Sequence, residues 1–275
     1  MTNVSAGTNE ILSFDGSDIA LTNGNSVTTT TNGLSVFVSV LGSTATVSFS
    51  GATLSNAQLQ TLVDGITYRN NSDDPTTAGN RVVTITSLSD NAGTANGGDD
   101  TSAPNVSSTV SINATNDAPV VVNLANETSN IIAAAGPSPV TGFGDAMVSD
   151  ADSGDYGGGF LTLAQTSGTT NGTWSLDGVN VMAGGDSTIS AGETIDYGGV
   201  TIGTVDSVDD GQAGRDLIIQ FASPGATSAR ITTLLQNLEY AASGGLGDRG
   251  FTLTLIDGDG NPYGGDPDAT VAFTI

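Results

Sequence analysis

Cysteine, histidine and lysine are all absent from this chain of 275 residues, in which every one of the five basic residues is arginine. Without cysteine no disulfide forms, and without cysteine and histidine the usual ligands of zinc are missing. The absence of histidine also excludes Ser-His-Asp and Cys-His catalytic arrangements. Paired aspartates could in principle serve glycoside hydrolysis, but a single tryptophan makes a sugar-stacking cleft hard to build. We therefore expect that the protein is not an enzyme.

Positive charge and long apolar runs are scarce as well. The net charge is −24, which disfavours nucleic acid and anionic membranes as partners. No apolar run reaches the length of a membrane span, so we expect no membrane insertion. The first residues also lack the pattern of a secretion signal. Nearly all the acidic residues are aspartate, which favours turns and oxygen-ligand metal sites over helices.

The apolar residues that are present follow the period of β-strands. Runs such as 35–40, 82–86, 160–163, 251–255 and 269–275 are rich in β-branched residues and are separated by Gly, Asn and Asp. An Asp-Gly pair at 177–178 predicts a hairpin between 173–176 and 179–181. The fold class that this predicts is all-β, with antiparallel β-sandwiches.

One helix is expected to interrupt the strands. Ser55 and Gln58 have the spacing of a capping box, Leu59, Leu62 and Val63 follow at helical spacing, and Gly65 ends the segment. This predicts a short helix over 55–64, and a matched one over 227–237 follows from the repeat described next.

An internal repeat divides the chain. An offset of 172 residues aligns Phe49 with Phe221 and Tyr68 with Tyr240, and a slightly smaller offset aligns Arg81 with Arg249. We therefore expect two sandwich domains, 1–117 and 118–275, each with one short helix. The second has additional residues before the matched phenylalanine. Either it carries extra strands, or the first domain is truncated at its start.

The joint between the two expected domains is residues 113–119. Pro119 cannot donate a ladder hydrogen bond and favours an extended residue before it. Asn116 and Asp117 provide oxygen ligands of the type that Ca²⁺ prefers. Bound Ca²⁺ at this joint is expected to fix the angle between the domains.

The joint and the matched segment resemble a known family. The run Asn116-Asp117-Ala118-Pro119-Val120 is similar to the boundary of tandem domains in giant bacterial surface adhesins. Residues 59–75 and 81–85 resemble the cadherin-like and chondroitin-sulfate-proteoglycan-type repeats of the same proteins, many of them exported by type I secretion. The resemblance implies a Ca²⁺-rigidified, Ig-like segment of an extracellular stalk that supports cell adhesion. Its partners would be the neighbouring repeats of the same chain.

Further Ca²⁺ ligands are predicted outside the joint. Asp150 and Asp152 resemble the D-x-D element that reaches the metal beside the preceding linker in cadherin-like repeats. Asp257, Asp259 and Asn261 alternate as in the first half of an EF-hand loop. Asp90 lies in the turn of the first domain that matches this loop, and it is a poorer candidate.

Two other kinds of function stay open at the level of sequence. One domain could be a binding module for a glycan or a protein. Alternatively, the chain could self-associate as the subunit of an extracellular filament or surface layer.

Overall fold

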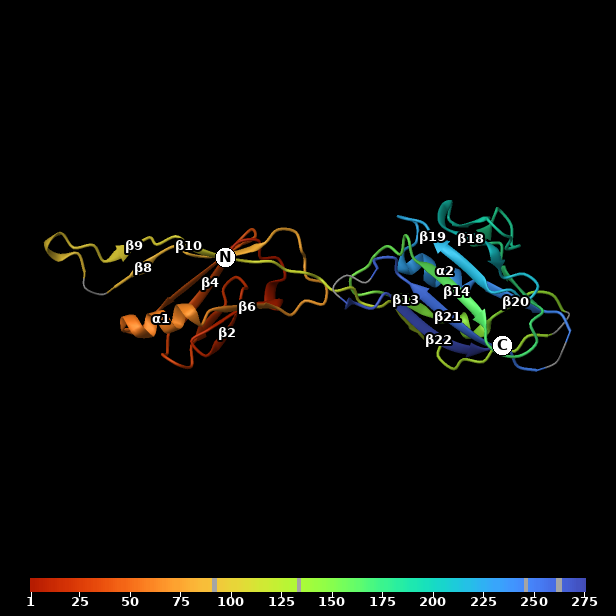
Figure 1. Cartoon of the computed structure of the whole chain (residues 1–275), viewed down its shortest axis with the longest axis horizontal. Helices are drawn as coiled ribbons and strands as arrows, with labels where there is room; N and C mark the ends of the chain where they lie inside the picture. Colours follow the sequence, from red (N-terminus) through yellow and green to blue (C-terminus); the bar gives the residue numbers. More distant parts are fainter. Residues whose placement is uncertain (91–92, 133–134, 245–246, 261–263) are drawn as a thin grey trace. The chain divides into compact units, whose positions relative to one another are not determined.

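The computed structural model describes residues 1–90, 93–132, 135–244, 247–260 and 264–275. The chain forms two compact units, Met1–Ala114 (unit 1) and Thr115–Ile275 (unit 2) (Figure 1). The division falls three residues before the expected boundary, so Asn116 and Asp117 belong to unit 2. The described residues are mostly strands in antiparallel sheets with two short α-helices, which confirms the all-β fold class.

Unit 1 contains two facing sheets. The smaller has the order β2-β1-β6, and the larger contains β3-β4-β5 and the pair β7-β10, which Thr2 bridges. A two-stranded extension, β8-β9, completes the unit. The bounds are β1 (Glu10–Phe14), β2 (Ser17–Ala20), β3 (Ser26–Thr28), β4 (Ser35–Leu41), β5 (Thr44–Ser50), β6 (Thr67–Asn70), β7 (Arg81–Ile85), β8 (Leu88–Ser89), β9 (Thr101–Ser102) and β10 (Val106–Val110).

Alternating side chains of the two sheets build the core of unit 1. Leu12 and Ile19 come from the smaller sheet, and Val36 and Val38 from the larger. Successive residues of a strand point to opposite faces, so each strand contributes every second residue to the core.

A tight turn at Asp15 and Gly16, both with positive φ, joins β1 to β2. The sequence contains this Asp-Gly signal, but our prediction did not use it.

Helix α1 (Asn56–Asp64) follows β5 and has the predicted N-terminus. The Ser55 side chain accepts a hydrogen bond from the Gln58 amide, and the Gln58 side chain accepts one from the Ser55 amide. This reciprocal capping box satisfies amides that the first helical turn leaves without partners. Leu62 is the buried residue of the helix, so α1 covers the edge of the core rather than crossing it.

Unit 2 is larger. A seven-stranded sheet of order β16-β17-β18-β19-β14-β21-β22 faces a three-stranded sheet, β12-β20-β15, and β11 pairs with β13. Its elements are β11 (Val120–Val122), β12 (Ser138–Pro139), β13 (Met147–Ser149), β14 (Phe160–Gln165), β15 (Gly172–Leu176), β16 (Val181–Ala183), β17 (Thr194–Tyr197), β18 (Val200–Asp210), β19 (Leu217–Phe221), α2 (Ser228–Gln236), β20 (Leu238–Ala242), β21 (Gly250–Ile256) and β22 (Asp268–Thr274).

Aromatic rings fill the centre of unit 2. Trp174 packs against Phe143, Tyr240 and Phe251, with ring centroids 4.9 to 6.3 Å apart. Trp174 is 1 % exposed, so its fluorescence reports on this core. Because it is the one tryptophan of the chain, that signal comes from unit 2 alone.

The predicted hairpin at Asp177-Gly178 is wrong. β15 pairs with β20, whereas β16 pairs with β17 in the other sheet. Asp177 accepts hydrogen bonds from the Val179 and Asn180 amides, which is the local turn that an aspartate can form without pairing two strands. The turn therefore carries the chain from one sheet to the other.

The two units share an order of elements. In unit 1, β5 is followed by α1, β6 and β7; in unit 2, β19 is followed by α2, β20 and β21. Arg81 begins β7 and Arg249 immediately precedes β21, and both are buried.

Neither helix of the described residues is long and apolar enough to cross a membrane.

Candidate metal centre

Three loops of unit 2 bring polar side chains together. The first is the segment that leads into β11 and contains Asn116 and Asp117. The second follows β13 and contains Asp150 and Asp152. The third follows β21 (Figure 1) and, by its position in the sequence, contains Asp257. Hydrogen bonds between the loops, described next, establish that these segments meet. We call Asn116, Asp117, Asp150, Asp152 and Asp257 the acidic cluster.

Asn116 links the first loop to the third. Its Nδ2 donates to Asp257 Oδ2 at 2.8 Å and to the carbonyl of Asp266 at 3.1 Å. Asn116 is 4 % exposed and Asp257 is 0 % exposed, so both are part of the interior. Gly265 makes this approach possible, because a Cβ there would lie 2.2 Å from the Asn116 carbonyl oxygen. The Oδ1 of Asn116 is the atom of this amide that could bind a cation.

Asp152 links the first loop to the second. The Asp117 amide donates to Asp152 Oδ2 at 3.2 Å. The amides of Asp152 and Ser153 both donate to Asp150 Oδ1 at 3.2 Å, which folds the second loop around the Asp150 carboxylate. One oxygen of each carboxylate is therefore held by backbone donors.

The other oxygens of these carboxylates have no donor. Among the described residues, Asp150 Oδ2 and Asp152 Oδ1 are buried without a hydrogen-bond partner. Buried polar groups in folded proteins are nearly always paired, because an unpaired one costs the desolvation energy of that group. Two such oxygens on neighbouring acids are the arrangement that a bound cation would satisfy.

The electrostatics of the cluster agree with its geometry. Burial raises the pKa of Asp150 to about 6, and the neighbouring Asp152 carboxyl acts in the same direction. Burial also raises the pKa of Asp257, which the Asn116 hydrogen bond opposes and the charges of Asp259 and Asp152 reinforce. Each shift records that negative charge is disfavoured here in the absence of a cation.

A buried tyrosine lies under the cluster. Burial raises the pKa of Tyr156 to about 12, and the charges of Asp150 and Asp257 contribute to the increase. Its ring packs edge-on against Phe221, with centroids 6.3 Å apart, which ties the second loop to the core. Tyr156 could not be predicted from the sequence, because a lone tyrosine between Asp and Gly belongs to no motif.

Of the three other predicted ligands, Asp259 and Asp90 lie outside the acidic cluster. Asp259 is exposed, and its amide donates to Asp257 Oδ1 at 2.9 Å. Asn261 lies outside the described residues. Asp90 belongs to unit 1, where its amide donates to the carbonyl of Asp100. Within the described parts of the chain, no set of three or more acidic side chains is already arranged to hold a metal ion. The acidic cluster combines an asparagine amide with carboxylates instead.

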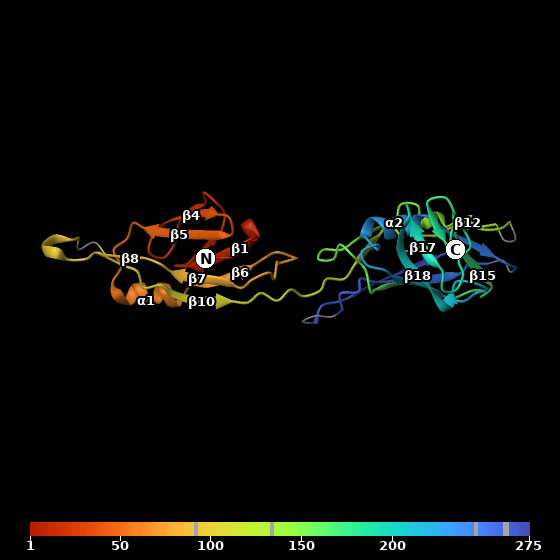
Figure 2. The same ribbon diagram turned by 90° about the horizontal axis from the view of Figure 1, so that it is seen from above.

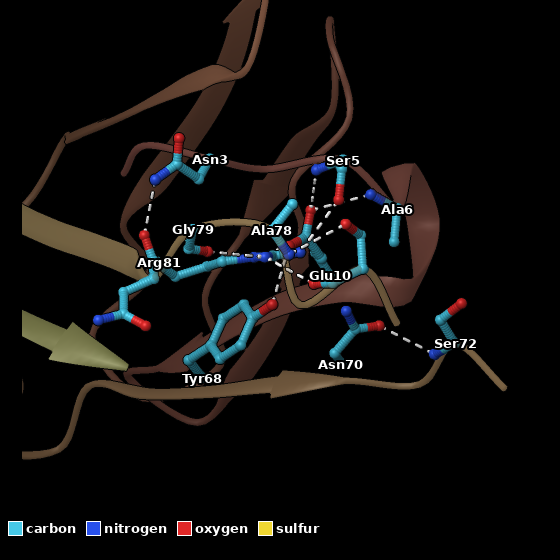
Figure 3. A network of polar contacts seen from close by, with 12 residues as sticks. Asn3, Ser5, Ala6, Glu10, Tyr68, Asn70, Ser72, Ala78, Gly79 and Arg81 are labelled. Carbon is cyan, nitrogen blue, oxygen red and sulfur yellow. Dashed lines mark hydrogen bonds and ion pairs between the residues drawn. The ribbon is translucent and has the colours of Figure 1, made fainter. Parts of the chain in front are cut away.

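Unit 1 buries an acid in a different way (Figure 3). Glu10 Oε1 accepts hydrogen bonds from Arg81 Nε at 2.8 Å and from the Tyr68 hydroxyl at 2.8 Å. Its Oε2 accepts from the amides of Ser5 and Ala6. Both Glu10 and Arg81 have side chains that are 0 % exposed. Burial raises the pKa of Glu10, but these hydrogen bonds outweigh it and hold that pKa below the ordinary value.

No motif in the sequence indicates that Glu10 pairs with Arg81, although the repeat matches Arg81 and Tyr68 to residues of the second unit. Within the described residues, no ion pair joins Arg249 to an acid, and Arg249 donates to the carbonyls of Thr169 and Gly244. Comparison with known proteins adds no assignment: no family model, curated protein or solved structure matches this chain.

Proposed function

We propose that this chain is a structural segment of a bacterial surface protein and that Ca²⁺ binds to the acidic cluster of unit 2. The observation that carries the proposal is the pair of buried carboxylate oxygens without donors, on Asp150 and Asp152. Ca²⁺ takes about six to eight oxygen ligands, and carboxylates and amide carbonyls are common among them. Asp150, Asp152, Asp257 and Asn116 would hold the ion from three loops.

Bound Ca²⁺ would act as a cross-link. It would offset the repulsion among the carboxylates and hold residues 116–117, where the chain enters unit 2, to the loops after β13 and β21. A ligand that binds only the folded state raises the free energy of unfolding. Extension and spacing are thus the role that fits two antiparallel sandwiches with a cation site where the chain enters one of them.

Isothermal titration with Ca²⁺, on full-length protein first stripped with chelator, tests the site. We expect saturable binding to the wild type and its loss in the variant Asp150→Asn with Asp152→Asn. The matched control is Asp73→Asn with Asp74→Asn, which removes the same charge from an exposed pair in unit 1. Equal binding by all three proteins would place the ion elsewhere.

Single-molecule stretching of the full chain tests the mechanical role. Ca²⁺ is expected to raise the force at which unit 2 unfolds and to leave the force for unit 1 unchanged. Unfolding forces that are the same with Ca²⁺ and with chelator would remove the support for a Ca²⁺-stiffened segment.

A second candidate, glycan binding, has one observation in its favour. A depression of about 640 Å³ in unit 2 is lined by Tyr197, Asn180 and Asp196, together with glycines of the adjacent turns. An aromatic face with amide and carboxylate groups is suited to a saccharide, which presents both apolar and hydroxyl surfaces. A glycan array that compares the wild type with Tyr197→Ala decides this, because only binding that the substitution abolishes would support it.

A further inference from the structure

The larger sheet of unit 1 is interrupted between β5 and β7. The N-terminus of the chain lies near this interruption (Figure 2). Thr2 is antiparallel to both, bridging Thr44 of β5 and Val82 of β7. The Thr2 amide donates to the Val82 carbonyl at 3.0 Å, and the Met1 ammonium donates to the Ala45 carbonyl at 2.7 Å. Residues 1 and 2 therefore behave as the end of a strand that enters between β5 and β7.

Beyond these residues the facing edges are open. Alternate residues of a strand direct their N–H and C=O groups to the same edge. Because Ala45 and Val82 face this opening, Val47 and Phe49 of β5 and Thr84 of β7 face it too. Within the described residues, no backbone hydrogen bond reaches these edges past Ala45 and Val82. The outer edges of β5 and β7 are occupied by β4 and β10. We call the space between the open edges the strand slot.

The side chains beside the strand slot are apolar and incompletely covered. Val47 and Val83 are half-buried and pack against the core of unit 1. Phe49 contacts the buried Phe14 ring at 5.7 Å, yet it remains 38 % exposed. A strand in the slot would cover all three, and it would also supply the missing backbone partners.

Unit 2 contains the strand that unit 1 lacks. β14 lies between β19 and β21 and is antiparallel to both. β19 precedes the helix of unit 2 as β5 precedes α1, and β21 follows the next strand as β7 follows β6. Leu161 and Leu163 of β14 are both 0 % exposed. The same chain thus shows what fills this place in a closed sheet: one strand with alternating apolar residues.

We propose that the strand slot takes a β-strand joined to Met1, which runs on upstream in line with residues 1–4 and occupies the place of β14. The existing register fixes its pattern. Met1 lies opposite Ala45 and faces the core, so the second and fourth residues before Met1 lie opposite Val47 and Phe49 and are apolar. The first residue before Met1 lies opposite Thr84 and faces solvent. The inference is independent of Ca²⁺, since no residue of the acidic cluster takes part.

The test adds five residues, Thr-Val-Thr-Val-Thr, before Met1 of the full chain. The control extension, Thr-Thr-Val-Thr-Val, has the same composition but directs both valines to solvent. Amide hydrogen exchange at Val47 and Thr84 is the readout, because these amides gain partners only if the strand docks. We expect the first extension to slow exchange at both amides by roughly tenfold or more and to raise the melting temperature of unit 1 by about 5 °C. The control should have a much smaller effect.

Three results would overturn the proposal. Unchanged exchange at Val47 and Thr84 in both extended proteins would show that the slot does not accept a strand. Equal protection by both extensions would contradict the predicted register. Protection of these amides in the unextended chain that increases with protein concentration, together with a doubled mass, would identify a second copy as the occupant.

Discussion

The two units bury acidic groups, and they do so with opposite electrostatics. In unit 1, Glu10 is buried against Arg81 and receives four hydrogen bonds, and its pKa lies below the ordinary value. In unit 2, Asp150 and Asp152 have buried oxygens without donors, and the pKa of Asp150 rises to about 6. A buried charge is tolerated when it is paired or bound to a metal. Unit 1 provides its own cation, whereas the Ca²⁺ site proposed for unit 2 would take its cation from solution.

Two units that share an order of elements are therefore expected to differ in how divalent cations change their stability. Divalent ions should not change the stability of unit 1, because its buried acid, Glu10, is already paired with the Arg81 side chain. Unit 2 should depend on them.

The largest expected effect is the removal of the internal cation of unit 1. Arg81→Leu leaves Glu10 buried without its partner, and breaking a buried ion pair in this way costs about 3–5 kcal/mol. The matched control is Arg69→Leu, which breaks the exposed pair with Asp18 and should cost far less, because solvent screens that pair. Thermal unfolding separates the units, because calorimetry records both transitions and Trp174 fluorescence records that of unit 2. Equal losses in the free energy of unfolding for the two variants would show that the buried pair stabilises unit 1 no more than the exposed pair does.

A smaller effect is expected from acid. Because the folded-state pKa of Glu10 is lowered, its contribution is present above the unfolded value and is lost as the pH falls through the folded value. Unit 1 should therefore lose stability as the pH falls below about 4.5, the ordinary value for a glutamate. Glu10→Gln removes this titrating group and should flatten that part of the pH profile. A profile that is equally steep in Glu10→Gln would assign the acid sensitivity of unit 1 to other groups.

The smallest effect compares the two helix N-termini. Ser55 accepts a hydrogen bond from the Gln58 amide, whereas Thr227, at the start of α2, makes no side-chain capping bond. Ser55→Ala should destabilise unit 1 by about 1 kcal/mol, and Thr227→Ala should destabilise unit 2 by less. Thermal unfolding of the two variants measures both. A larger loss from Thr227→Ala would mean that local capping does not determine the difference.

Local signals in the sequence predicted local structure, but not which strands pair. The capping box of Ser55 and Gln58 predicted α1 because all of its partners lie within one turn. The Asp177-Gly178 pair predicted a hairpin, and the prediction was wrong because β15 and β16 found partners in different sheets. A turn sequence determines where the chain bends, but long-range strand pairing determines what the bend connects.

The candidate site was predictable in its residue types and not in its assembly. Asn116 and Asp257 are 141 residues apart, and no local pattern indicates that they form a hydrogen bond. The D-x-D spacing identified Asp150 and Asp152, and the linker motif identified Asn116 and Asp117. The role of Asp90 as a ligand in the matching turn of unit 1 stays a prediction, and its amide donates to the carbonyl of Asp100. Glu10 and Arg81, 71 residues apart, were not paired by any motif.

Thermal unfolding of the full chain, with Ca²⁺ in excess and then with chelator, tests the central claim most directly. Trp174 fluorescence reports on unit 2, and calorimetry records both units. The account predicts that Ca²⁺ raises the melting temperature of unit 2, with a stabilisation of about 2.7 kcal/mol at a hundredfold excess over the dissociation constant. It predicts no change in unit 1. A transition of unit 2 that is identical with Ca²⁺ and with chelator would contradict the claim that its buried acids require an external cation.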